Sequence, residues 1–205
     1  MKQEHVGGLV RGTLISTSDG LRPIESLKVG DLVVSSPEDD PAVSRLEPVV
    51  GLFRHDGQKI RQLLVDGGAV GKIEMIAASW NTPFWAVNEG WTRADALNRQ
   101  MALRRLDGTD CDVVRQYPVY RTEAPGVGWT QSMAQVELSH GNLYDYDNAK
   151  GLPMGGFDCV VSQEVLNSEQ PFLTTTVWDL RLGGLHNFYA GKQTVRVRCL
   201  DGAAG

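Results

Sequence analysis

Patterns that hold metal ions are missing from this chain of 205 residues. The four histidines are scattered, and the three cysteines lie far apart with no Cys-x-x-Cys pair; they are Cys111, Cys159 and Cys199. A structural zinc site needs four such ligands at characteristic spacings. The acidic run 145–148 also lacks the twelve-residue calcium loop with its closing Glu. We therefore expect no metal, no cofactor and reduced thiols in a cytoplasmic setting.

Long apolar runs and an excess of basic charge are also missing. No apolar stretch approaches the roughly 18 residues of a membrane-spanning helix, and residues 1–12 contain no signal-peptide core. The formal net charge of -5 at pH 7 argues against the basic face of a nucleic-acid-binding protein. We expect a chain that binds neither nucleic acid nor membrane, and that is cytoplasmic before any export by a specialised secretion system.

Helical periodicity is scarce, whereas short runs of β-branched and aromatic residues recur between Gly, Pro, Asp and Asn turns. This alternation predicts an all-β domain. Only 22–29 and 92–101 have a helical pattern, each of about two turns, with Thr92 as a cap of the second. The expected strands are 12–17, 31–36, 48–53, 60–65, 73–78, 83–87, 112–121, 134–138, 160–166, 172–182, 186–191 and 194–200.

The chain has the length of one substantial domain, so we expect residues 1–205 to form a single unit. Segment 124–158 is rich in Gly, Asn and Asp and is less regularly patterned. We interpret it as a long insertion that carries a hairpin and packs on the domain. The last residues, 200–205, are small and polar and predict a flexible tail.

Three separated segments resemble the opening, middle and closing blocks of the Hint fold, which is shared by inteins, hedgehog autoprocessing domains and the pre-toxin domains of bacterial polymorphic toxins. They are 8–35, 73–97 and 177–205. The last keeps Asp179 and His186 at the family spacing of seven. The resemblance is strongest to the pre-toxin domains. It implies a horseshoe of long bent strands with pseudo-two-fold halves, two short helices and a β-rich insertion.

The resemblance also implies a chemistry. In working members a Cys or Ser at the first position attacks its preceding peptide bond, as an activated nucleophile must. A Thr-x-x-His block polarises that peptide and protonates the departing amine. A terminal His-Asn pair then lets the Asn side chain cyclise and release the downstream polypeptide.

This sequence departs from the pattern at each of these steps. The first position is Gly8, which has no side chain to attack with. The Thr-x-x-His block falls on 79–82, so Thr82 replaces the imidazole. The closing pair falls on Arg198 and Cys199, so the cyclising Asn is absent and its neighbour is a cation that cannot act as a base. The usual autoprocessing route is therefore blocked.

The remaining candidates have two interpretations each. Asp179 and His186 are either structural, as a turn-bonding carboxylate and a packed β-face residue, or the remnant of a charge relay or ligand site. Ser79 and Thr82 are either turn hydroxyls that bond the local backbone or catalytic groups. Cys199 is either a buried strand thiol or a nucleophile.

Our leading hypothesis is a degenerate, non-processing Hint-like domain that acts as a binding or accessory module in a bacterial toxin or secretion system, and that is not an enzyme. Its vacated cleft would hold a protein or peptide partner. The cleft would be lined by Gly8, Ser79, Thr82, Asp179, His186, Arg198 and Cys199.

Two alternatives stay open. The first is a self-cleaving domain that uses a displaced nucleophile together with Asp179 and His186. The nucleophile would be Ser16, Ser18, Ser79 or Cys199. The second is a toxin effector grafted into the scaffold over 104–175.

Overall fold

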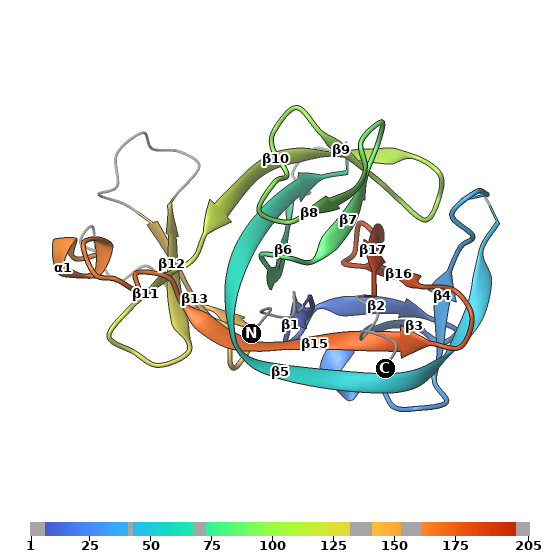
Figure 1. Ribbon diagram of the computed structural model, residues 1–205, viewed down its shortest axis with the longest axis horizontal. Helices are drawn as coiled ribbons and strands as arrows, with labels where there is room; N and C mark the ends of the chain where they lie inside the picture. The colour runs from blue at the N-terminus through green and yellow to red at the C-terminus, as the bar shows by residue number, and fades with distance from the viewer. Residues whose placement is uncertain (1–6, 41–42, 68–72, 132–140, 153–160, 200–205) are drawn as a thin grey trace, which may run out of the picture.

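The computed structural model describes residues 7–40, 43–67, 73–131, 141–152 and 161–199, and almost all of its regular structure is strand (Figure 1). The predicted all-β class is confirmed. Within these ranges the elements are β1 (Leu9–Val10), β2 (Leu14–Thr17), β3 (Gly20–Pro23), the 3-10 turn η1 (Ile24–Ser26), β4 (Leu32–Ser35), β5 (Arg45–Asp66), β6 (Ile73–Ser79), β7 (Pro83–Ala86), β8 (Gly90–Arg93), β9 (Ala102–Arg104), β10 (Asp110–Pro118), β11 (Tyr120–Arg121), β12 (Val127–Gln131), β13 (Gly141–Asp145), β14 (Lys150–Gly151), α1 (Gln163–Leu166), β15 (Thr174–Leu182), β16 (Asn187–Ala190) and β17 (Val195–Arg198).

The main sheet consists of two similar halves joined by the pair β16–β17. On one side β16 pairs with β2, β2 with β4 and β4 with β5. On the other side β17 pairs with β7, β7 with β9 and β9 with β10. After the hairpin β2–β3, the Ile24 amide donates to the Thr13 carbonyl over 2.9 Å. At the equivalent place after the hairpin β7–β8, the Ala94 amide donates to the Thr82 carbonyl over the same distance. The predicted pseudo-two-fold is thus present in strand order and in local hydrogen bonding.

The long strand β5 forms the outer arc of the horseshoe (Figure 1). It pairs with β4 at one end, with β15 in the middle and with β6 and β10 at the other end. The prediction of a turn between strands 48–53 and 60–65 is wrong. The two predicted strands are one continuous strand, since positions on both sides of Gly57 pair with β15. One extra residue on β5 forms a bulge there, and Gly57 takes a φ of +69°, which bends the strand without ending it.

The main hydrophobic core joins the two halves. Aliphatic and aromatic side chains from both meet around the central strands, and each fully buried side chain contributes roughly 1.5–3 kcal/mol. The members include Ile15, Ile24 and Val33 from the first half, Phe84, Leu97 and Leu103 from the second, and Phe188 and Val197 from β16 and β17.

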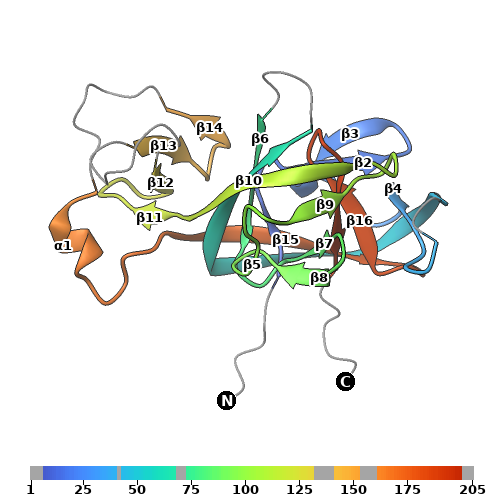
Figure 2. The ribbon, with the colours of Figure 1, turned by 90° about the horizontal axis from the view of Figure 1, so that it is seen from above.

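A second sheet, β11–β12–β13–β14, lies beside the horseshoe (Figures 1 and 2). It contains the described part of the predicted insertion 124–158. Tyr146 is buried against Val10 and Val177 of the main sheet, and its hydroxyl donates to the Gln62 side-chain oxygen over 3.0 Å. The segment therefore packs on the scaffold. Residues 132–140, 153–158 and the expected tail 200–205 lie outside the described residues.

Two helix expectations need correction. The segment 22–29 contains only the single 3-10 turn η1. The segment 92–101 has no helix, because Thr92 belongs to β8 and pairs with Phe84, and the amide of Ala94 is used by the distant Thr82 carbonyl. Conversely, the expected strand 160–166 contains α1, which Ser162 caps by accepting from the Val165 amide. No helix in the described part of the chain is long and apolar enough to cross a membrane.

Replacing Phe84 with Ala should lower the free energy of unfolding by about 3–5 kcal/mol, because the ring is fully buried between the halves and its loss leaves a cavity. Urea denaturation of both proteins measures the difference. The control Val29→Ala removes a side chain that is 68% exposed and should change stability by less than about 0.5 kcal/mol. Equal effects of the two substitutions would contradict the assigned core.

Candidate functional site

Position 8 lies in a cradle of hydrogen bonds just before β1. The Thr82 hydroxyl donates to the Gly8 carbonyl over 2.8 Å and accepts from the Gly8 amide over 3.0 Å. It also shares a hydrogen bond of 2.9 Å with the Ser79 hydroxyl, and the Ser79 amide donates to the Gly8 carbonyl over 2.9 Å. A hydroxyl has one donor and two acceptor positions, so these contacts use the whole capacity of Thr82. The expectation of a hydroxyl that bonds only its local turn is wrong, since Thr82 reaches across 74 positions.

The backbone at Gly8 has no room for a side chain. Its φ is +145°, a conformation that residues with a Cβ rarely adopt. A Cβ built there would lie 2.8 Å from the Trp178 carbonyl oxygen and 2.8 Å from the Val177 Cγ2 atom. The first of these is rigid strand backbone. The site therefore lacks a nucleophile and, in this conformation, also the space for one.

The amide nitrogen of position 8 is the group that would depart as an amine in the chemistry implied by the resemblance. Thr82 contacts that nitrogen directly, from the position where the family carries its imidazole. A threonine hydroxyl does not titrate near neutral pH, so it can hold the amide but cannot protonate it. The hydroxyl at position 82 thus contacts the amide nitrogen without being able to donate a proton to it as an acid.

Asp179 lies beside the cradle. Leu9 of β1 pairs with Trp178 of β15, and continuing that register by one residue sets Gly8 opposite Asp179. The Asp179 side chain is buried, and its carboxylate accepts from the Leu180 amide over 2.8 Å. The carboxylate thus bonds the backbone of β15, whereas the expected structural role was to bond the Gly-Gly turn.

His186, Arg198 and Cys199 form a second group. The Cys199 amide donates to the His186 carbonyl over 2.9 Å. Phe84 of β7 pairs with Val197 of β17, and continuing this register by two residues sets Thr82 opposite Cys199. The start of β7 and the end of β17 thus lie side by side, which relates Thr82 of the cradle to Cys199 of the second group.

Exposure separates the members of the second group. Cys199 is buried, as expected. Arg198 is half-buried, with its guanidinium 5.7 Å from the centre of the Trp91 ring. His186 is exposed and precedes β16, so the expectation of a packed β-face residue is wrong. Of these three side chains, those of His186 and Arg198 are thus accessible to solvent.

The serines proposed as displaced nucleophiles, and the thiol of Cys111, show no sign of activation for attack on a peptide bond. Ser16 is buried, and its hydroxyl has no hydrogen-bond partner among the described residues. Ser18 is exposed and donates to Asp19 at a turn. Burial raises the pKa of Cys111 to about 12, which keeps that thiol protonated. Cys159 lies outside the described residues. Within the described ranges, His, Cys, Asp and Glu do not gather in threes as metal ligands do.

The sequence pattern does not predict the position of one residue of the region, Arg196. An alternating Val-Arg strand normally exposes its arginines, but Arg196 is fully buried. It donates to the Asn187 side chain over 3.1 Å and to the carbonyls of Ser36 and Pro37 over 2.9 and 2.8 Å. Burial lowers its pKa. The guanidinium also lies 5.0 and 5.4 Å from the ring centres of Trp85 and Trp91. These two tryptophans are the sequence feature that could have indicated a cation packed at this place.

Comparison with protein-family models and with curated proteins gives no match. Solved structures do match. An intein-like domain from Clostridium thermocellum superposes with a TM-score of 0.60 at 18% identity, covering 93% of this chain and 97% of that one. A DnaB intein from Synechocystis sp. PCC 6803 gives 0.57 at 16% identity, covering 95% and 99%. The gp41-1 intein gives 0.55 at 15% identity, covering 94% and 98%. At these identities the likeness shows that the chain has the intein, or Hint, fold.

Replacing Thr82 with Val should lower the free energy of unfolding by about 1–3 kcal/mol, because the buried Gly8 amide loses the Thr82 hydroxyl as its acceptor. Urea denaturation measures the loss. Thr82→Ser keeps the hydroxyl and removes one methyl group, so it should cost only about 0.8 kcal/mol. A Val variant as stable as the Ser variant would contradict the cradle.

Proposed function

We propose that this chain is a non-processing Hint-fold module that binds a protein or peptide partner in a bacterial toxin or secretion system. The observation that carries the proposal is the Gly8 cradle. Hydrogen bonds join Gly8, Ser79 and Thr82. They hold the peptide at position 8, but position 8 has no nucleophile to attack that peptide and position 82 has no imidazole to protonate its amine. The toxin or secretion context rests on the resemblance of 8–35, 73–97 and 177–205 to pre-toxin domains.

The chemistry of the site supports binding over cleavage. Acyl shift needs a thiol or hydroxyl at position 8 and an acid at position 82, and neither is present. Release needs an Asn where Cys199 stands. Because hydrogen bonds from Thr82 and Ser79 hold the peptide at position 8, we interpret the difference from working members as one of reacting groups and not of the scaffold.

The cleft retains groups suited to a peptide. His186 is exposed, Arg198 is half-buried, and Asp179 and Thr82 are buried. In the proposed cleft the first two would supply the accessible polar groups. A guanidinium forms strong paired hydrogen bonds with a carboxylate. The proposed ligand is therefore a peptide tail or a side-chain carboxylate that pairs with Arg198.

If the chain does not process itself, the intact mass of the purified protein should stay that of all 205 residues during long incubation, with or without added thiol. The Gly8→Cys variant should behave in the same way, because position 82 still lacks an imidazole. Loss of residues 1–7 from the wild-type chain would overturn the proposal and favour a displaced nucleophile. Loss from the Cys variant alone would show that Gly8 is the only missing part.

If Arg198 holds the partner, capture from the native host with the tagged wild-type chain should recover a protein that Arg198→Ala fails to recover. The matched control is Arg99→Ala, since Arg99 is an exposed arginine in a turn away from the cleft. It should retain the partner at the wild-type level. Equal recovery by both variants would rule out the Arg198 cleft as the binding site, and no recovery above background by the wild type would count against a binding module.

A further inference from the structure

The strand β6 has one edge that is mostly unpaired. On one side all seven residues from Ile73 to Ser79 pair with β5. On the other side β6 pairs with β1 at Ala78 alone. The rest of that edge, 73–76, faces no strand among the described residues. An unpaired edge presents amide and carbonyl groups that can accept another strand.

The reason lies in how short β1 is. After Val10 the chain turns away from β6, and both the Thr13 amide and the Thr13 hydroxyl bond the Val10 carbonyl, over 3.2 and 2.8 Å. Gly12 takes a φ of +80°, which permits this tight turn. β1 therefore covers only the far end of β6.

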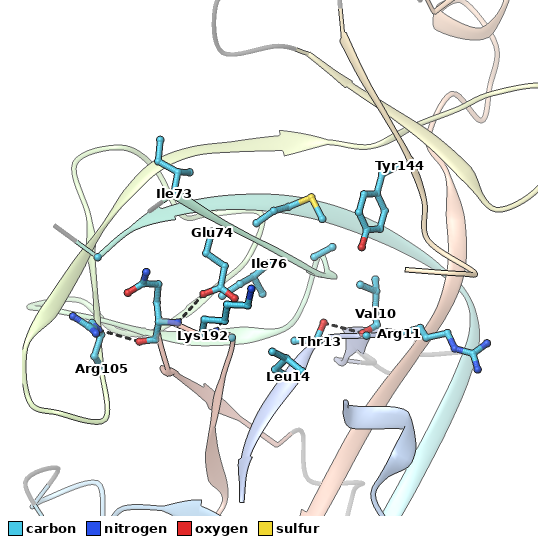
Figure 3. A pocket seen from close by; sticks show the side chains of 16 residues that line it. Val10, Arg11, Thr13, Leu14, Ile73, Glu74, Ile76, Arg105, Tyr144 and Lys192 are labelled. Atoms are coloured by element: carbon cyan, nitrogen blue, oxygen red, sulfur yellow. Dashed lines mark hydrogen bonds between the residues drawn. The ribbon is translucent and has the colours of Figure 1, made fainter. Parts of the chain in front are cut away.

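The open edge of β6 borders a cavity of about 710 Å³ (Figure 3). Residues 73–77 form one wall, and residues 10–14 and 191–193 form the opposite walls. Tyr144 of the second sheet closes one side, with its ring directed toward Val10 (Figure 3). The cavity thus continues the line of β1 along β6, in the place of a missing neighbouring strand.

The backbone of β6 is oriented for pairing at this edge. The Ser79 amide bonds Gly8 on the β1 side, whereas the next amide, Trp80, bonds Lys59 of β5. Because successive residues alternate in direction along a strand, the amide and carbonyl of Met75 point away from β5 and toward the cavity. Natural edges are usually guarded by Lys, Pro or a bulge. The run Ile-Glu-Met-Ile-Ala contains no Lys or Pro, and its one charged side chain, Glu74, is bonded to the amides of Lys192 and Gln193.

The charges around the cavity favour carboxylates. Among the lining residues the cations are Arg11, Arg105 and Lys192, and the anion is Glu74. Both Glu74 oxygens are engaged, accepting from the amides of Lys192 and Gln193 over 2.6 and 2.7 Å. Arg11 and Arg105 have carboxylate neighbours at 3.5 and 3.4 Å, and the exposed Lys192 ammonium has no partner among the described residues.

We propose that this groove binds an extended acidic peptide segment of a partner protein, which adds as a strand to the open edge of β6 and directs a carboxylate to Lys192. The backbone of Met75 supplies the ladder hydrogen bonds, and Lys192 selects for acidic side chains. This site is separate from the Arg198 cleft, so it does not depend on the function proposed above.

The test uses a fluorescently labelled eight-residue peptide of alternating Val and Glu, titrated with the full chain and followed by anisotropy. The wild-type chain should bind it saturably, and the same peptide with Lys in place of Glu should bind at least about tenfold more weakly. Methylating the peptide amides that face β6 should also abolish binding. No saturable binding of the acidic peptide, or equal binding of the Lys peptide, would overturn the proposal.

Two pairs of variants locate the contact. Met75→Pro removes the edge amide without removing a hydrogen bond to β5, so the fold should persist while the affinity falls at least about tenfold. Its control is Met75→Leu, which should bind like the wild type. Lys192→Glu should weaken binding at least about tenfold, whereas Lys28→Glu, at an exposed turn outside the groove, should not. Thermal unfolding of each variant verifies folding.

Other results are equally informative. If Met75→Pro unfolds, Lys192→Glu and the methylated peptide decide the question. Unchanged affinity in Lys192→Glu would overturn the acidic specificity. Dimerisation of the chain that Lys192→Glu or Met75→Pro abolishes would identify a second copy as the occupant and overturn the peptide proposal. Arg198→Ala should leave peptide affinity unchanged, so failure here is distinguishable from failure of the Arg198 cleft.

Discussion

The bulged pairing of β5 with β15 sets the geometry on which the rest of the structure depends. These two strands run together past Gly57, and the extra residue on β5 bends both of them. β15 pairs with β1 on one side, and β6, which pairs with β5, flanks β1 on the other. The chain around position 8 therefore lies between β15 and β6. These pairings place the segment before β1 beside the end of β6, where the Ser79 amide bonds the Gly8 carbonyl. The cradle at Gly8 and the groove along β6 are therefore consequences of one strand pairing.

The Gly8 cradle shows how the peptide at position 8 is held although position 8 has no nucleophile and position 82 has no imidazole. The Thr82 and Ser79 hydrogen bonds hold this peptide. The holding interactions stabilise the fold, since a buried amide without a partner costs about 1–3 kcal/mol. A glycine at position 8 and a threonine at position 82 are thus compatible with a folded protein, while removal of the Thr82 hydroxyl is costly.

Much of the fold was accessible from the sequence because the strands alternate in polarity and are separated by turn residues. The failures occurred where tertiary contacts override local patterns. The segment 92–101 has helical spacing, yet the Ala94 amide bonds Thr82 and the helix does not form. Gly57 has the signature of a turn, yet both flanks find the same partner strand and the turn becomes a bulge. The strand expected over 160–166 contains a helix that Ser162 caps.

The sequence by itself determined that position 8 has no nucleophile, that position 82 has no imidazole and that position 199 has no amide side chain, because these are properties of the residues and not of their arrangement. Only the tertiary structure decided that the Thr82 hydroxyl bonds Gly8, that Arg196 is buried while His186 is exposed, and that β6 keeps an open edge. The period of two along a strand specifies which side chains share a face. It does not specify which strand lies alongside, and contacts across 74 positions depend on that pairing.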